Sequence, residues 1–204
     1  MRVVVIVLIV LIILVILFVE IPWCGVNSMR YRWIDYVFNV KTKVGHMVGL
    51  TKLDKEVCYE NMRLIHEIFG RRGIKFYLTW GTALGLIRGG DLLDWDDDVD
   101  IGAPYSELEK IQDAIPDLRA AGFRLTEVGR DNKFMAFLRR GEKIDLDITT
   151  PGCTSLRDEC IIEDVVMDEL TTIDVRGLRY NIVTEKFLES YYGKDWRTPR
   201  QSKW

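Results

Sequence analysis

Histidine is scarce in this 204-residue chain, which carries only His46 and His66. A histidine-based metal site or a Ser-His-Asp triad therefore has little material to build on. The four cysteines lack CxxC spacing and are too few for a disulfide scaffold; Cys153 and Cys160 can pair or remain free thiols. No GxxxxGK(S/T) run occurs, which excludes a P-loop. The formal net charge of −3 argues against a general nucleic-acid binder.

One uninterrupted apolar run, residues 3–19, lies near the start of the chain. It is at the short end for a membrane-spanning helix but long for a signal-peptide core, and no small-x-small cleavage site follows it. We therefore predict an uncleaved transmembrane signal anchor over residues 1–22. Basic residues on its two sides nearly balance, so the positive-inside rule leaves the orientation open. Residues 23–53 mix basic and aromatic side chains, as in a stalk on an anionic membrane surface or a solvated linker, which leaves residues 54–204 for one folded domain.

Aspartates are concentrated in one short stretch of that domain. Carboxylates at this density repel one another unless something positive is present, and a divalent cation with oxygen ligands is the simplest candidate. A strand starting at Asp98 would place Asp98 and Asp100 on one face, and Val99 and Ile101 in the core. Asp96 has the same parity. The sequence therefore predicts that Asp96, Asp98 and Asp100 bind Mg²⁺ or Mn²⁺.

Two small residues, Gly81 and Thr82, lie between a strand-like run at 74–78 and a short apolar run. This order predicts a strand, a tight turn and a helix whose first N–H groups, together with the threonine hydroxyl, contact a phosphate. Arg88 can contact the same phosphates through a bidentate guanidinium, or it can simply balance the aspartate charge.

A second alternating run, residues 143–149, contains Asp145 and Asp147. Either aspartate can supply a third carboxylate, as a metal ligand or as the base that activates an acceptor hydroxyl. The alternative is that both lie on the exposed face of an edge strand.

Hydrophobic periodicity predicts helices and strands around the aspartates, and Gly102, Ala103 and Pro104 indicate a turn. The mixture predicts an α/β (α+β) domain with a mixed sheet flanked by helices. The expected helices are 53–72, 105–121 and 184–192, and the expected further strands are 123–128, 133–140, 169–175 and 178–183.

Two separated motifs carry a family resemblance. GTALGLIRGGDLLDWDDDVDIG, from Gly81 to Gly102, resembles the signature of the LicD/fukutin family, and residues 192–199 resemble its YG-x-x-W-x-x-P ending. The resemblance covers residues 55–204 and implies a nucleotidyltransferase-like fold of the DNA polymerase beta type. It also implies transfer of a phosphorylated alcohol, such as phosphocholine or ribitol phosphate, from a CDP-linked donor to a glycan acceptor. Fukutin-like members are anchored with the catalytic domain in the Golgi or ER lumen, which is the location the resemblance favours, whereas bacterial relatives would be cytosolic.

Two other classes of protein use the same features. A DxD-type glycosyltransferase holds a metal ion under a sugar nucleotide, but its fold needs a longer nucleotide-binding half before the DxD than this chain offers. A non-catalytic, membrane-tethered scaffold could keep the fold without turnover, although the full set of carboxylates argues against a loss of catalytic activity. Because the chain carries little beyond a catalytic core, acceptor recognition can fall to a protein partner.

Overall fold

The computed structural model of the chain describes residues 53–129, 132–149 and 170–199. The predicted signal anchor, almost all of the stalk and the segment that holds Cys153 and Cys160 lie outside these residues. Among the helices that are described, none combines the length and the hydropathy that a membrane crossing requires.

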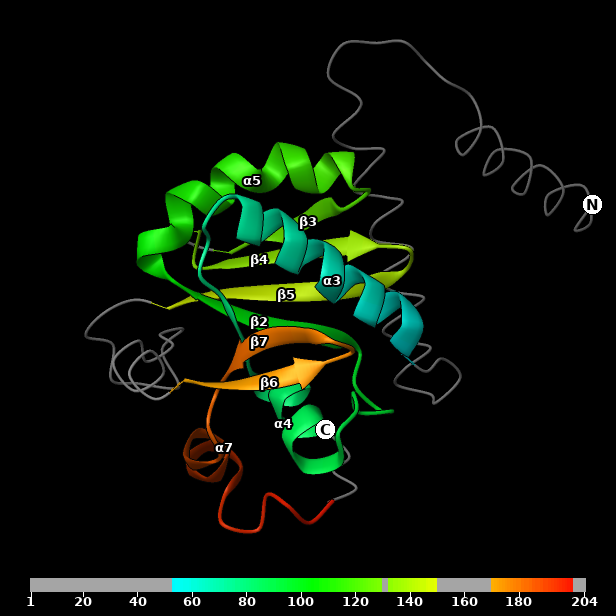
Figure 1. Cartoon of the computed structure of the whole chain (residues 1–204), viewed down its shortest axis with the longest axis vertical. Coiled ribbons are helices and arrows are strands. Elements are labelled where there is room, and N and C mark those ends of the chain that lie inside the picture. The colour runs from blue at the N-terminus through cyan, green and yellow to red at the C-terminus, as the bar shows by residue number, and fades with distance from the viewer. Residues whose placement is uncertain (1–52, 130–131, 150–169, 200–204) are drawn as a thin grey trace, which may run out of the picture. The chain divides into compact units, whose positions relative to one another are not determined.

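The described strands form one mixed seven-stranded sheet in the order β3-β4-β5-β2-β1-β7-β6 (Figure 1). The pairs β2–β5 and β1–β7 are parallel, and the other neighbours are antiparallel. The mixed α/β sheet predicted from the sequence is confirmed. The strands are β1 (Tyr77–Leu78), β2 (Asp98–Pro104), β3 (Arg124–Val128), β4 (Phe134–Arg139), β5 (Glu142–Thr149), β6 (Thr171–Val175) and β7 (Leu178–Ile182).

Helices cover both faces of the sheet (Figure 1). On one face, α3 packs beside α5 and against β5 and β2. On the other, α4 packs against β2 and α7 packs against α4. The helices are α3 (Lys55–Arg71), α4 (Trp80–Gly89), α5 (Leu108–Ala120) and α7 (Glu185–Tyr192), and a 3₁₀ turn, η1 (Tyr105–Glu107), precedes α5.

Alternation along β2 and β5 separates an apolar face from an acidic one. Val99 and Ile101 are buried in the core, as the sequence predicts. Their neighbours on β5 are Ile144 and Leu146, which are also buried. Glu142 shares the parity of these two residues and contacts Cys58 of α3, so α3 covers the apolar face. The aspartates therefore face the side of α4.

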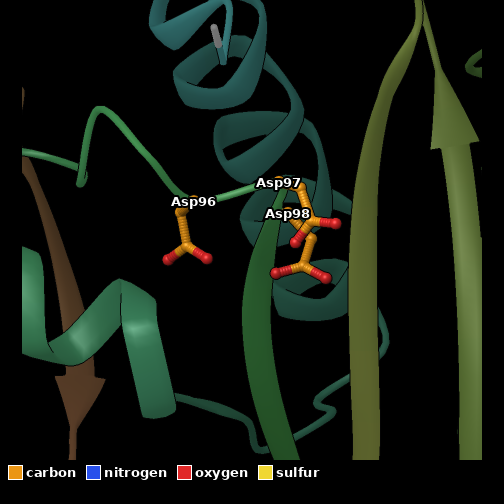
Figure 2. Close-up of side chains that lie close together, drawn as sticks. All are labelled: Asp96, Asp97 and Asp98. Atoms are coloured by element: carbon orange, nitrogen blue, oxygen red, sulfur yellow. The ribbon is translucent and has the colours of Figure 1, made fainter. Parts of the chain in front are cut away.

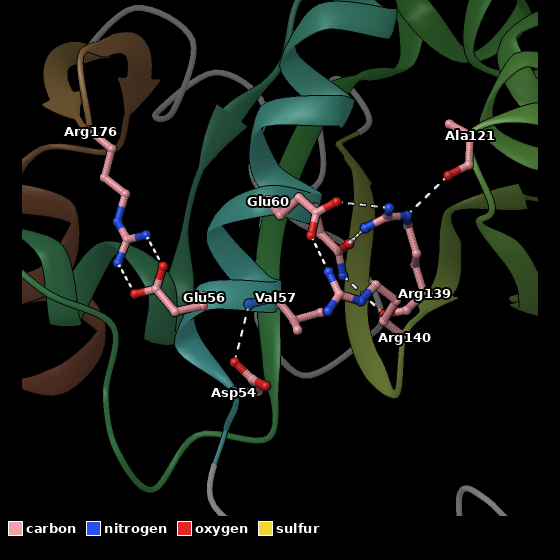
Figure 3. Close-up of polar contacts among 9 residues, drawn as sticks. Asp54, Glu56, Val57, Glu60, Ala121, Arg139, Arg140 and Arg176 are labelled. Atoms are coloured by element: carbon pink, nitrogen blue, oxygen red, sulfur yellow. Dashed lines mark hydrogen bonds and ion pairs between the residues drawn. The ribbon is translucent and has the colours of Figure 1, made fainter.

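Helix α3 is fixed to its surroundings by ion pairs (Figure 3). Glu56 receives two hydrogen bonds of 2.6 Å from Arg176, in the turn between β6 and β7. Glu60 pairs with Arg139 and Arg140 at the end of β4. A cavity of about 390 Å³ lies among these paired charges, and the described aspartates of β2 and β5 do not line it.

Residues 102–104 were predicted to form a turn, and that prediction is wrong. They continue β2, because β5 pairs with all three residues and β1 pairs with Gly102 on the other side. Gly102 is required there, since the ring of Tyr77 lies 2.3 Å from the position that a Cβ atom would occupy. Long-range strand pairing has overridden the local preference of glycine and proline.

Candidate functional site

The parallel pairing of β2 with β5 brings the predicted carboxylates together. The register places Asp98 beside Lys143, Asp100 beside Asp145, and Gly102 beside Asp147. These residues share one parity, so their side chains lie on the same face of the sheet. Because β5 lies between β4 and β2, the edge-strand alternative for Asp145 and Asp147 is excluded.

The first turn of α4 is bound to β2 through Asp100. The Gly81 N–H donates to Asp100 Oδ2 at 3.0 Å, and the Asp100 N–H donates to Thr82 Oγ1 at 2.8 Å. The helix begins at Trp80, so Gly81 and Thr82 lie inside its first turn rather than in a separate turn before it. Thr82 is only 1% exposed. Their contact with a phosphate stays a prediction.

Three consecutive aspartates meet where the chain enters β2. One carboxylate oxygen from each of Asp96, Asp97 and Asp98 lies within 4.8 Å of the others (Figure 2). Asp97 was not among the predicted ligands, because its parity in a strand would be wrong. The strand begins only at Asp98, however, so strict alternation does not apply to Asp97.

Several carboxyl groups of the site have a raised pKa, because burial and neighbouring negative charges disfavour their ionised form. Burial, followed by the charges of Asp98 and Asp97, raises the pKa of Asp96 to about 7. Burial also raises the pKa of Asp145 to about 7, against the lowering effect of Lys143. Burial and the neighbouring aspartates hold the pKa of Asp100 well above its usual range.

A divalent cation fits this set of residues. Hard oxygen ligands are present at close range, and Asp145 Oδ1 is buried without a hydrogen-bond partner among the described residues. An orphaned buried carboxylate oxygen in an acidic cluster is satisfied when a cation binds nearby. Mg²⁺ and Mn²⁺ both match such a donor set.

We expect the metal-free protein to lose stability as the pH rises from about 4 to about 7. Asp96 and Asp145 have pKa values of about 7 in the folded protein and about 3.9 when unfolded. In that window the folded state binds more protons than the unfolded state, so the free energy of unfolding falls with pH. Thermal unfolding of the full-length chain in EDTA should show the fall, at about 2–4 °C per kcal/mol. Millimolar Mn²⁺ should abolish it; a melting temperature in EDTA that is flat or rises with pH would contradict this assignment.

Lys143 is a site residue that the sequence analysis missed. Its Nζ lies 2.8 Å from Asp98 Oδ2 and 2.8 Å from Asp145 Oδ2. Burial lowers its pKa, but these two carboxylates outweigh the burial and raise it, so the side chain is a permanent cation. Lys143 lies two residues before Asp145 in the alternating run 143–149, so it shares a strand face with Asp145 and Asp147. This alternation is the signal that could have identified it.

Trp80, at the start of α4, was also missed. Its backbone has a φ of +43°, a left-handed conformation that is unusual for a bulky residue and that often marks functional sites. Its Nε1 donates to Asp147 Oδ2 at 2.7 Å. Its ring packs edge-on against Phe187 and Tyr191, with ring centroids 5.4 Å and 4.5 Å away. Trp80 therefore holds Asp147 in place and links the site to α7.

Replacing Trp80 with phenylalanine should reduce stability by about 1–3 kcal/mol at pH 8, because it removes the donor from a buried carboxylate while keeping a ring. The indole N–H lowers the pKa of Asp147 against the burial that raises it to about 6. The loss should therefore be smaller at pH 5, where Asp147 is protonated. Thermal unfolding at both pH values measures the difference. Trp95→Phe is the matched control, since Trp95 is 60% exposed; equal losses from the two variants would contradict the role of Trp80.

Arg88, in the last turn of α4, contacts the C-terminal motif and the loop before β2. Its Nη1 donates to the backbone oxygen of Trp196 at 3.3 Å, and its Cζ lies 5.7 Å from the ring centroid of Trp95. Trp196 is buried, so the C-terminal motif packs on the core, although Pro199 is exposed. The predicted contact of Arg88 with phosphate stays a prediction.

The chain is similar to known proteins in sequence and in fold. A model of the family described as LicD/FKTN/FKRP, nucleotidyltransferase domain, matches residues 73–174. An uncharacterised protein of Rickettsia typhi is 31% identical over 67 residues, which are 33% of this chain and 22% of that protein. One of Rickettsia prowazekii is 29% identical over 68 residues, 33% of this chain and 26% of that protein. This chain thus spans about a quarter of the length of the curated relatives it matches.

A solved structure shows the fold as well. The solution structure of the antibiotic-resistance factor ANT(2'')-Ia matches with a TM-score of 0.51 and 15% identity. The match covers 74% of this chain and 77% of that one. The similarity supports a common fold and leaves the chemistry to be argued from the site.

Proposed function

The chain belongs to the LicD/FKTN/FKRP nucleotidyltransferase family, and we propose that it transfers a phospho-alcohol from a CDP-linked donor to a glycan hydroxyl. Membership of the family supports transferase activity. The proposal concerns the rest: a donor of the phosphocholine, ribitol phosphate or glycerol phosphate type, and dependence on Mg²⁺ or Mn²⁺.

The observation that carries the proposal is the convergence of carboxylates from β2, β5 and the loop before β2 on one sheet face, beside the start of α4. Asp96, Asp98 and Asp100 would hold the metal ion. When bound, the ion neutralises charge on the donor diphosphate and on the transferring phosphoryl group. Positioning and electrostatic stabilisation account for most of the catalysis in phosphoryl transfer.

Asp145 is the better candidate than Asp147 for the third carboxylate. Asp147 accepts a hydrogen bond from Trp80, whereas Asp145 Oδ1 is buried without a partner among the described residues. Asp145 also lies directly beside Asp100 in the register. In our proposal Asp145 binds metal or takes the proton of the acceptor hydroxyl, and Asp147 orients Trp80.

The donor class can be tested by thermal stabilisation of the full-length chain in detergent. CDP-choline, CDP-ribitol and CDP-glycerol would be compared with UDP- and GDP-sugars, each with Mn²⁺ and with EDTA. A Mn²⁺-dependent rise with a CDP-alcohol alone supports the proposal. A rise with a sugar nucleotide alone supports the glycosyltransferase, and no rise with any combination supports the scaffold. Asp98→Asn is the control that should abolish a genuine metal-dependent rise.

Membrane anchoring through residues 3–19 and a lumenal catalytic domain are part of the same proposal. The test is protease protection of the full-length chain in sealed membrane vesicles of known orientation. A domain protected until the vesicles are lysed supports the lumenal location. A domain cleaved on the cytosolic side overturns it without affecting the proposed chemistry.

A further inference from the structure

Lys143 occupies the space between two carboxylates of the proposed site. Its ammonium makes ion pairs of 2.8 Å with Asp98 and with Asp145 at the same time. Both aspartate side chains are 14% exposed and the lysine side chain is 25% exposed. The lysine is thus a mostly buried part of the site and not a surface charge.

A two-metal phosphoryl-transfer site needs a second ion that stabilises the opposite oxygen of the displacement. Asp98 and Asp145, on adjacent strands, are the carboxylates between which such an ion would lie here. An ion held by these two carboxylates would lie against the ammonium of Lys143. Like charges at that separation repel strongly in a buried setting.

Among the described residues, Lys143 forms its ion pairs with Asp98 and Asp145, whereas the carboxylates at the entry to β2 offer oxygens for one ion. The carboxylates of Asp96, Asp97 and Asp98 lie close enough together to share it. The site therefore combines a pair of carboxylates bridged by an ammonium with a cluster open to one divalent cation, and Asp98 belongs to both.

We infer that Lys143 serves as a fixed cation in place of a second metal ion, so that the site holds one divalent ion. This inference rests on the proposed metal-dependent function. Its consequence is that the charge of Lys143, and not its packing, sets the number of ions the protein binds.

The test counts bound ions on the full-length chain by titration with Mn²⁺, following the electron paramagnetic resonance signal of the free ion at about pH 8, well above the ordinary pKa of a carboxyl group. The wild type should bind one ion per chain. Lys143→Met keeps the aliphatic stem but removes the charge, and it should bind a second ion between Asp98 and Asp145. Lys143→Arg keeps the charge and should bind one ion.

Lys55→Met is a matched control. Lys55 also bridges two aspartates, Asp91 and Asp94, at 2.8 Å and 2.6 Å, and its side chain is also 25% exposed. Those aspartates are 53% and 60% exposed and lie outside the proposed metal ligands. Lys55→Met should leave the stoichiometry at one ion.

The outcomes separate this inference from the function on which it rests. Two ions on the wild type, or one ion on Lys143→Met, overturn the role of Lys143 and leave the metal-dependent transferase intact. No bound ion on the wild type overturns both. If Lys143→Met fails to fold, the test relies on the ion counts of the wild type and of Lys143→Arg. Two ions bound to Lys143→Arg would then overturn the inference.

Discussion

Replacing Asp100 with asparagine should lower turnover by about 10³-fold or more and leave the fold intact. Asp100 lies at the centre of the acidic face, next to Asp145 in the register and 3.0 Å from the Gly81 amide. Losing a ligand of the ion that stabilises the transferring phosphoryl group removes several kcal/mol of transition-state stabilisation, and about 4 kcal/mol corresponds to 10³-fold.

Stability should move in the opposite direction. Asparagine has nearly the shape of aspartate, and its side-chain oxygen can still accept from the Gly81 N–H. Burial and the neighbouring aspartates raise the pKa of Asp100, so the charged form is costly in the metal-free protein. The metal-free variant should therefore melt at a higher temperature than the wild type at pH 8. A purely structural role for Asp100 predicts the reverse.

Asp94→Asn is the control for turnover. Asp94 belongs to the same aspartate-rich stretch but is 60% exposed and pairs with Lys55. Its replacement should keep near-wild-type activity. If Asp100→Asn retains more than about one tenth of the wild-type turnover, the assignment of Asp100 as a metal ligand is wrong.

Gly81→Ala has the second largest expected effect, a loss of about 10²-fold in turnover together with weaker Mn²⁺ binding. A Cβ atom on Gly81 would lie 2.2 Å from Asp96 Oδ2 and 3.3 Å from Asp100 Oδ2. The Asp96 side chain must then turn away from the site. Displacement of a site group by about 1 Å can cost 10²-fold in rate.

The same helix offers a matched control. Gly89 is the last residue of α4, and an added Cβ there would meet nothing within 4 Å. Gly89→Ala should therefore keep its activity and be neutral or stabilised, by up to about 1 kcal/mol, through the better helix propensity of alanine. Mn²⁺ affinity and thermal unfolding of both variants measure the contrast. Wild-type Mn²⁺ affinity in Gly81→Ala would show that Asp96 is not needed in its present position.

Alternation was the most informative local signal. It predicted that Val99 and Ile101 are buried, and that Asp98 and Asp100 share the opposite face, because side chains alternate along any extended strand. The two motifs also predicted the family, and the match of the family model to residues 73–174 confirms it. The strands predicted at 169–175 and 178–183 are confirmed as β6 and β7, which pair with each other.

The local rules failed where contacts distant in sequence override them. The predicted turn at 102–104 is part of a central strand, because β1 and β5 complete its hydrogen bonds. Asp97 was left out of the site by a parity rule that does not apply before the strand begins. The left-handed backbone at Trp80 has no signal in the sequence, since tryptophan rarely adopts it.

The sequence by itself determined which face of each strand is acidic, and it identified the family through its two motifs. It could not distinguish Asp145 from Asp147, because both have the same parity in one strand. The tertiary structure alone shows how their surroundings differ: the register of β5 against β2 sets Asp145 beside Asp100 and Lys143 beside Asp98, and α4 brings Trp80 to Asp147. Strand register and helix docking depend on contacts between segments more than 40 residues apart, such as Asp98 and Lys143. The spacing of residues within a single strand does not specify these contacts.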